Sequence, residues 1–394
     1  MMFLCWACSP IVLDAYPPAT IIEGDMIETS PLQIVGSVFY PDLRDLGHFS
    51  WHADPFGEQG VRCSFVDGCV ENPLGAWGIE VLARSGSEEI SSYVQQDGSF
   101  RIDVEEQGEW DIRFLLRYCT EETCFHFVEE NVVYGLSHPE SPFWVSSSLG
   151  VSLSPVLFQE ERIESGEPNN HAHAANHFAS LMEIGFIWHV QGGASFYNDK
   201  YKPLKIILPT SLDTYGRTTG PSTVHLPEQT QGWIKGNKIM HEYGHVLNLR
   251  AWDGYFWFDG EAFPNWSSVT PQESHIAFKE GFANFVARSS ETEHSCSGGF
   301  DHNPPLGTLE DGLLYPRNVT RFFCDLFDDS QEEDFFFPPS FFMTLLEDVL
   351  FHAKEENNRV LSLCSVVDVL CTHWDVSDTE KLKTLALRNN INCW

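Results

Sequence analysis

Basic residues are scarce in this 394-residue sequence, which has 23 Lys and Arg against 57 Asp and Glu and a net charge of -34. A surface this negative repels the phosphates of nucleic acids and the headgroups of anionic lipids, so neither is expected as a partner. The charge suits solubility, calcium association or a salt-rich environment, and composition does not choose among these.

Long apolar runs and internal repeats are also lacking. No run reaches the roughly 18 to 20 residues of a membrane-spanning helix, and no period of about 20 to 50 residues marks a repeat architecture. Hydrophobic residues nevertheless make up 42% of the chain and aromatic residues 13%, which is enough to bury real cores. The length allows two or three domains.

The 11 cysteines are spaced as in an exported protein. Close spacing predicts two local disulfides, Cys63–Cys69 and Cys119–Cys124, and buried free thiols are the alternative. The remaining cysteines of the C-terminal half are Cys296 and Cys324, which flank a loop, and Cys364, Cys371 and Cys393, which cluster near the end.

The first residues, "MMFLCWACSP", contain the one Cys-x-x-Cys motif of the chain, and a lone motif does not favour a structural zinc ribbon. Residues 1–8 resemble the end of a bacterial lipoprotein signal, with Cys8 after the small residue Ala7 as the site of a lipid anchor. The basic start of such a signal is missing, so we interpret 1–8 as a truncated signal behind a start codon placed too late. Residues 9–31 predict a tether. The expected location is secreted or cell-envelope.

The chain divides into a β-rich half and a helix-rich half, which predicts a multidomain α+β protein. Between 32 and 158, short runs such as "QIVGSVFY", "GSFRIDVE" and "EWDIRFLL" are bounded by turn residues, and Asp97-Gly98 marks a tight hairpin. We expect an all-β sandwich there. Its strand order resembles the transthyretin-like or carboxypeptidase-regulatory-like sandwiches attached to secreted enzymes, with another Ig-like sandwich as the alternative. Polar residues 159–170 predict a linker.

From 171 to 394 helical periodicity dominates. Two helices matter most: "NKIMHEYGHVLNLR" and "SHIAFKEGFANFVARSS". The strand "STVHLP" (222–227), just before the first of these helices, fits either the edge strand of a substrate cleft or an ordinary edge strand.

The motif "HEYGH" places two histidines one helical turn apart, so His241 and His245 can reach one ion. Glu242 lies about 100° round the helix, close to that ion but pointed past it. A base is needed there, because zinc brings bound water to a pKa of about 7 and a glutamate completes its deprotonation.

A third ligand decides the kind of site. A metzincin would have it at Ala251, which cannot bind a metal, so that interpretation fails. Glu280, on the second helix, is the better candidate. Asn284 lies one turn later on the same face and can hold the far ring nitrogen of a ligand histidine.

HEYGH followed by EGFAN resembles the gluzincin metallopeptidases, the thermolysin-like clan, over about residues 170–394. The resemblance implies a zincin-like domain with His241, His245 and Glu280 as zinc ligands and Glu242 as general base. Two features depart from the clan. The segment before Glu280 is longer than usual, and Asn284 stands where the clan usually has aspartate.

Other polar groups leave alternatives open. "GTLED" imitates the motif by which aspzincins supply an aspartate ligand, here Asp311, although it is one residue out of register. A group that stabilises the oxyanion is also required, and the candidates are Tyr315, His302 and Tyr215. The histidines of "HAHAANH" (171–177) suggest a metal cluster or, more simply, a solvated helix start. The acidic run Asp325 to Asp334 suggests calcium or a solvated loop.

The sequence therefore predicts an exported zinc endopeptidase that acts on protein or peptide substrates. The alternative is a non-catalytic cell-surface binding or adhesive protein that retains a zincin-like zinc site. The intact base Glu242 favours the enzyme, because a binding module has no need of it.

Overall fold

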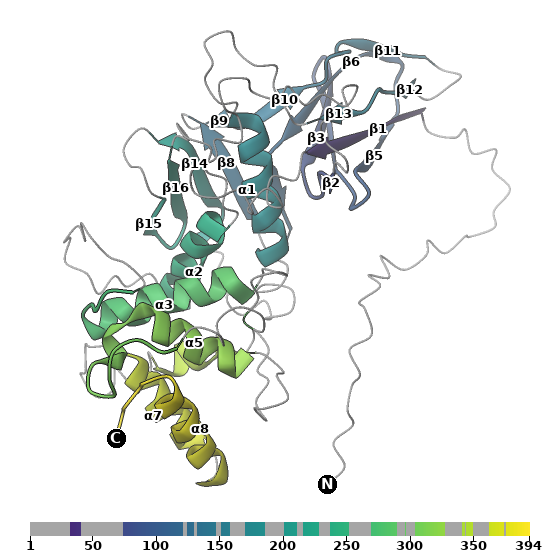
Figure 1. Ribbon diagram of the computed structural model, residues 1–394. Coiled ribbons are helices and arrows are strands. Elements are labelled where there is room, and N and C mark those ends of the chain that lie inside the picture. Colours follow the sequence, from purple (N-terminus) through teal and green to yellow (C-terminus); the bar gives the residue numbers. More distant parts are fainter. Residues whose placement is uncertain are drawn as a thin grey trace, which may run out of the picture. The chain divides into compact units, whose positions relative to one another are not determined.

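The computed structural model describes the strands and helices on which the site is built. The described residues are 32–40, 74–120, 124–129, 132–146, 151–157, 170–185, 201–210, 216–227, 237–251, 269–289, 296, 304–327, 341–342, 344–349, 362–373 and 376–394. The predicted signal (1–8), tether (9–31) and nearly all of the linker lie outside them. Strands and helices are both abundant, so the expected α+β class is confirmed (Figure 1).

Two five-stranded sheets contain most of the N-terminal strands. The first comprises β1 (Leu32–Tyr40), β2 (Leu74–Gly75), β5 (Ser99–Val104), β12 (Val151–Ser152) and β13 (Val156–Leu157). The second comprises β3 (Glu80–Ser85), β4 (Glu88–Tyr93), β6 (Gly108–Leu115), β10 (Gly135–Ser137) and β11 (Phe143–Val145). In β6, Trp110, Ile112 and Phe114 alternate with exposed residues and are fully buried. This two-residue period is why the segment is stable as a strand with one face in the core.

The Asp97-Gly98 turn is present, but it does not close a simple hairpin. Gly98 has a φ of +83°, and the Asp97 carboxylate accepts a hydrogen bond of 2.9 Å from the Ser99 N–H. The strands on either side belong to different sheets, because β5 pairs with β1 and β4 pairs with β3. The turn residues set the local geometry, and strand pairing far away in sequence decides the sheet.

A six-stranded sheet joins residues from both halves of the chain. Its order is β15 (Arg217–Gly220), β16 (Thr223–Pro227), β14 (Leu204–Thr210), β8 (Cys124–Glu129) and β7 (Arg117–Cys119), with β9 (Val132–Val133) on β8. β14 runs parallel to both β8 and β16. This sheet therefore includes strands from both of the segments that the sequence assigns to separate domains, 32–158 and 171–394.

The physical reason for this pairing lies in the apolar face of β8. Phe125 and Phe127 are buried, and their ring centroids lie 5.4 and 5.5 Å from that of Phe178 on α1 (Asn170–Gly185). A strand buried in this way gains more beside β14 and under a helix than at a solvated sheet edge.

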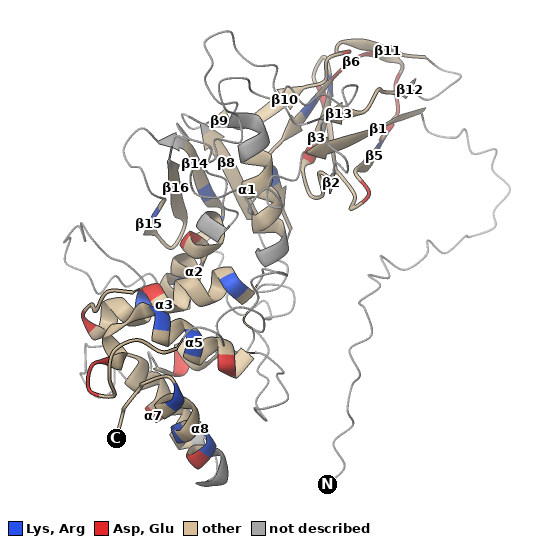
Figure 2. Cartoon of the chain, in the orientation of Figure 1, with Lys and Arg blue, Asp and Glu red and all other residues tan. Residues whose placement is uncertain are grey.

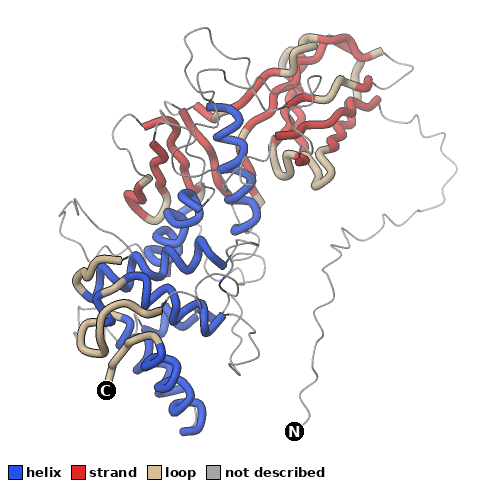
Figure 3. The backbone as a smooth tube through the Cα atoms, in the orientation of Figure 1, coloured by secondary structure: helices blue, strands red, loops and turns tan. Residues whose placement is uncertain are grey.

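Helices follow in the C-terminal half, as Figure 3 shows. They are α2 (Asn237–Ala251), α3 (Ser274–Ser289), the short η5 (Gly312–Leu314), α5 (Pro316–Phe327), α7 (Leu363–His373) and α8 (Val376–Arg388). Among the described helices, none has the length and apolar character needed to cross a membrane.

Aromatic packing holds α3 against α5. Phe278, Phe282 and Phe285 of α3 are fully buried, as the apolar stripe of the sequence predicts. The ring of Phe323 on α5 lies 5.5 Å from both Phe282 and Phe285. Each ring removes a large apolar area from water, so this contact fixes the position of α3 and of its polar face.

The first residue of the acidic run, Asp325, has a structural role. Asp325 is buried, and its carboxylate accepts a hydrogen bond of 2.6 Å from the side-chain amide of Asn389. Asn389 in turn accepts one of 2.9 Å from the Arg321 guanidinium. Through these bonds the Asp325 carboxylate links α5 to Asn389, directly after α8. Residues 328–334 lie outside the described residues.

Three disulfides occur among the described cysteines. Cys119 is bonded to Cys124, as predicted, and the other pairs are Cys296–Cys324 and Cys364–Cys393. Cys371 forms no disulfide with any described residue. The predicted Cys63–Cys69 pair lies outside the described part of the chain. The observed disulfides are compatible with an extracellular protein.

Candidate metal centre

The helix α2 presents two histidines to α3. Its apolar side, which contains Ile239, Val246 and Leu247, is buried in the core. His241 and His245 lie one turn apart, and their ring centroids are separated by 4.7 Å. Helical spacing therefore brings the two imidazoles together as the motif predicts.

Glu280 of α3 meets both imidazoles. Its Oε2 atom lies 3.3 Å from Nε2 of His241 and 3.4 Å from Nε2 of His245. One donor atom from each of the three residues lies within 4.8 Å of the others, so together they could hold one metal ion. Glu280 and His245 are buried, whereas His241 is about one-seventh exposed, since its side chain retains 15% of its accessible surface. The group is therefore approached from the side of His241.

Gly244 allows this close approach of the helices. A Cβ atom built on Gly244 would lie 2.7 Å from the Cα of Ala283 in α3, closer than real side chains come. Any larger residue here pushes α3 away from α2, and Glu280 moves with it. The glycine inside the HEYGH motif thus has a packing role between the two histidines.

The charges of the group are mutually dependent. Burial opposes ionisation of Glu280, but the imidazoles of His245 and His241 outweigh it and hold the pKa of Glu280 well below its ordinary value. Burial lowers the pKa of His245. At His241 burial acts in the same direction, but the neighbouring Glu280 carboxylate prevails and raises the pKa. Figure 2 colours the charged residues of both helices, and Nζ of Lys279 on α3 lies 4.0 Å from Oε1 of Glu280, so this lysine also contributes to the local field.

Asn284 orients one of the imidazoles. Its side-chain oxygen lies 3.0 Å from Nδ1 of His241. An amide oxygen only accepts, so Nδ1 carries a proton, and Nε2, which faces Glu280, is the nitrogen that could bind a metal. Nδ1 of His245 is buried and has no hydrogen-bond partner among the described residues.

Glu242 contacts the six-stranded sheet through Thr218. Its Oε2 atom accepts a hydrogen bond of 2.9 Å from the hydroxyl of Thr218, which also lies 2.8 Å from the main-chain oxygen of Glu242. The carboxylate is buried yet does not join the metal-binding group. Thr218 was not predicted as a site residue. One threonine in the segment "RTTG" gives no signal that it lies beside a helix more than 20 residues later.

Among the described strands, β15 forms one edge of the six-stranded sheet, and β7 ends its other side. Residues 222–227 were predicted to supply an edge strand, but β16 lies between β14 and β15 and is paired on both sides. The prediction was wrong because residues 217–220 fold back onto β16 in antiparallel register, which the short polar segment does not indicate. β15 is therefore the strand that ends this side of the sheet among the described residues.

Asp311 is occupied elsewhere. Its Oδ1 atom accepts hydrogen bonds from the main-chain N–H and the hydroxyl of Thr308, and these bonds lower the pKa of Asp311. The carboxylate closes the turn before η5 and does not join His241 and His245. Glu280, and not Asp311, is the carboxylate that lies with His241 and His245.

Of the remaining predicted residues, only Tyr315 and the side chain of His177 belong to the described part of the chain, and neither is part of the group. The ring of Tyr315 lies against Gly307, in the same turn as Asp311. His302 and Tyr215 lie outside the described residues, as do the side chains of His171 and His173. His177 is buried in α1, so it is not part of a solvated helix start. Comparison of the chain with family models, with curated proteins and with solved structures found no match.

Proposed function

We propose that this chain is a metal-dependent hydrolase, and specifically a zinc endopeptidase. The observation that carries the proposal is the position of Glu280, whose Oε2 atom lies within 3.4 Å of Nε2 of both His241 and His245. The resemblance of HEYGH and EGFAN to the gluzincin motifs, which contain the same three residues, also supports it.

The donor set favours zinc. Two imidazole nitrogens and one carboxylate oxygen are the protein ligands of many catalytic zinc sites, which leave the fourth position for water or substrate. Zinc bound there would lower the pKa of a water molecule to about 7 and polarise the carbonyl of a scissile peptide bond. Asn284 supports this use, because the hydrogen bond between Nδ1 of His241 and its side-chain oxygen leaves Nε2 as the nitrogen that could bind the metal.

Glu242 is the proposed general base. It follows His241 directly but is not one of the three ligands, so it is free to take a proton from water. The same carboxyl group then delivers that proton to the leaving amine. The hydroxyl of Thr218 holds one carboxylate oxygen, which leaves the other oxygen for the proton transfer.

A peptide is the proposed substrate. β15 ends the six-stranded sheet among the described strands, and Thr218 on β15 contacts Glu242. An extended peptide that pairs with such an edge lies along the strand beside the base. We infer an exported enzyme, since three disulfides occur in the described chain.

Metal analysis combined with peptide cleavage tests the proposal. The purified chain should contain one zinc per molecule and cleave members of a broad peptide library. A chelator should abolish the cleavage, and added zinc should restore it. Zinc without cleavage of any peptide would point to the alternative, a surface binding protein. A chain without zinc affinity would contradict both.

A further inference from the structure

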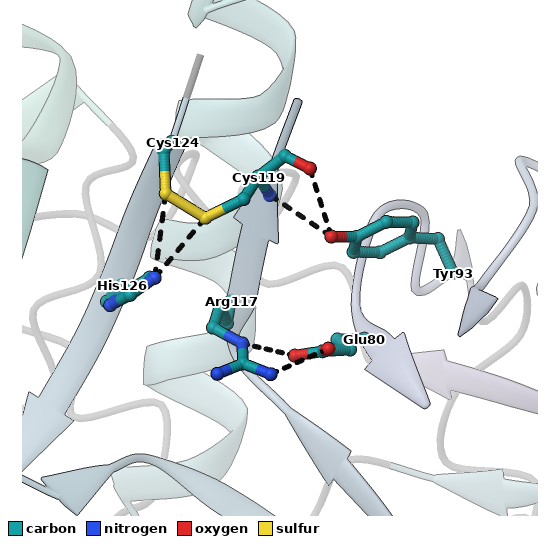
Figure 4. Close-up of polar contacts among 6 residues, drawn as sticks. All are labelled: Glu80, Tyr93, Arg117, Cys119, Cys124 and His126. Atoms are coloured by element: carbon teal, nitrogen blue, oxygen red, sulfur yellow. Dashed lines mark hydrogen bonds and ion pairs between the residues drawn. A yellow bond between two sulfur atoms is a disulfide. The ribbon is translucent and has the colours of Figure 1, made fainter. Parts of the chain in front are cut away.

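A second group of metal-binding side chains lies on the β7–β8 hairpin. Nε2 of His126 is 3.3 Å from Sγ of Cys119 and 3.6 Å from Sγ of Cys124. Figure 4 shows the imidazole turned toward both sulfurs. Donor atoms of the three residues lie within 4.8 Å of one another. The group shares no residue with the candidate metal centre.

Strand geometry places the three side chains on one face. Cys119 is directly opposite Cys124 in the antiparallel pairing of β7 and β8. His126 follows Cys124 by two residues, and side chains two apart on a strand point to the same side. The arrangement therefore depends on main-chain pairing, which continues from β8 into β14, and not on the sulfur–sulfur bond alone.

Side chains of β3 and β4 also hold β7 in place. The Tyr93 hydroxyl of β4 donates to the main-chain oxygen of Cys119 at 3.1 Å and accepts from its N–H at 3.3 Å. Two residues earlier, Nη2 of Arg117 pairs with Oε1 of the buried Glu80 at 2.7 Å. Figure 4 shows both contacts beside the disulfide. Opening the disulfide removes neither of them, so Cys119 stays in place.

We propose that this group is a redox-gated metal site, closed as a disulfide when oxidised and able to bind one zinc ion through Cys119, Cys124 and His126 when reduced. Two thiolates and an imidazole are preferred zinc ligands, and three of them leave the fourth position for water. Rotation about the Cα–Cβ bonds separates the sulfurs to the roughly 3.7 Å that two zinc–sulfur bonds of about 2.3 Å require. The strand pairing is unchanged.

The chemistry balances with a dithiol as reductant. The dithiol passes two electrons and two protons to the disulfide and is itself oxidised to a disulfide, which leaves Cys119 and Cys124 as thiols. Binding of one divalent zinc ion then displaces those two protons. Oxidation reverses the sequence and releases the ion, so disulfide and metal exclude each other.

Cobalt spectroscopy on the full chain tests the proposal. Cobalt(II) replaces zinc and gives a thiolate-to-metal absorption that a site of histidines and carboxylate lacks. The chain is reduced with a phosphine, because a dithiol would compete for the metal. We expect the absorption, with one additional cobalt per molecule, in the reduced chain and not in the oxidised chain.

Matched variants assign the absorption to this group. Cys119→Ser/Cys124→Ser and His126→Ala should lose it, whereas Cys364→Ser/Cys393→Ser, which removes a different disulfide, should keep it. His126→Ala retains both cysteines, so it still tests the site if the double cysteine variant does not fold. The proposal is overturned if the reduced chain shows no such absorption, or if His126→Ala shows it at full strength.

Discussion

The hydroxyl of Thr218 lies 2.9 Å from a carboxylate oxygen of Glu242 and 2.8 Å from its main-chain oxygen. This relationship joins an edge strand of the six-stranded sheet to the helix that carries both histidines. The hydrogen bond holds the carboxylate of Glu242, the proposed general base, through a residue that is not one of the proposed metal ligands. Helix, strand and base therefore form one unit, and each of its parts can be tested separately.

Thr218→Val should lower kcat by about 10- to 100-fold, because a hydrogen bond to a charged group contributes roughly 1.5 to 3 kcal/mol. Zinc content and KM should stay near normal, since the variant changes the orientation of Glu242 and not the ligands. Thr218→Ser keeps the hydroxyl and should recover most of the rate. Steady-state peptide cleavage by the two variants makes the comparison, and equal rates in valine and serine variants would rule out a positioning role.

Glu242→Gln should keep one zinc per molecule and lose about 10³-fold in kcat, because the amide cannot take a proton from water. The substitution preserves size and a hydrogen-bond acceptor for Thr218, so the fold should be unaffected. Cleavage rate and metal content are measured on the same preparation. Near-normal turnover would show that another residue is the base.

Glu280→Ala should lose zinc and activity together, because two histidines and water bind zinc too weakly. Asp311→Ala is the matched control. It removes a carboxylate that closes a local turn with Thr308 and should keep both zinc and activity. Equilibrium dialysis followed by peptide cleavage distinguishes the two. The reverse result would make the aspzincin interpretation correct.

Gly244→Ala should destabilise the chain by about 1 to 3 kcal/mol and weaken zinc binding, because its new methyl group meets the backbone of Ala283. Gly220→Ala is the control, since no atom lies within 4 Å of a Cβ built there. Denaturant unfolding of metal-free protein measures the first effect, and zinc titration measures the second. If both variants unfold like the parent, the helices are not held as closely as described.

Non-reducing peptide mapping should find Cys119–Cys124, Cys296–Cys324 and Cys364–Cys393 linked in protein from an oxidising compartment. An alkylating reagent should label Cys371 without prior reduction. The sequence further predicts a Cys63–Cys69 link. Labelling of Cys119 and Cys124 in unreduced protein would remove the main support for an exported chain.

The local features of the site could be predicted from the sequence. The spacing of His241 and His245 is a property of any α-helix, and the apolar stripe of α3 indicates which face of that helix carries Glu280 to the core. A short cross-strand disulfide, Cys119–Cys124, was likewise predicted from close spacing in strand-like sequence. Each of these depends only on residues within a few positions of one another.

What the tertiary structure alone decided depends on contacts between distant segments. The pairing of β8 with β14 joins strands from both halves of the chain in one sheet. The folding back of β15 onto β16 makes β15 an edge strand in place of β16. The contact of Thr218 with Glu242 follows from that edge. Strand pairing and close helix packing are chosen by burial over the whole chain, and a short polar strand or a single glycine does not signal them in advance.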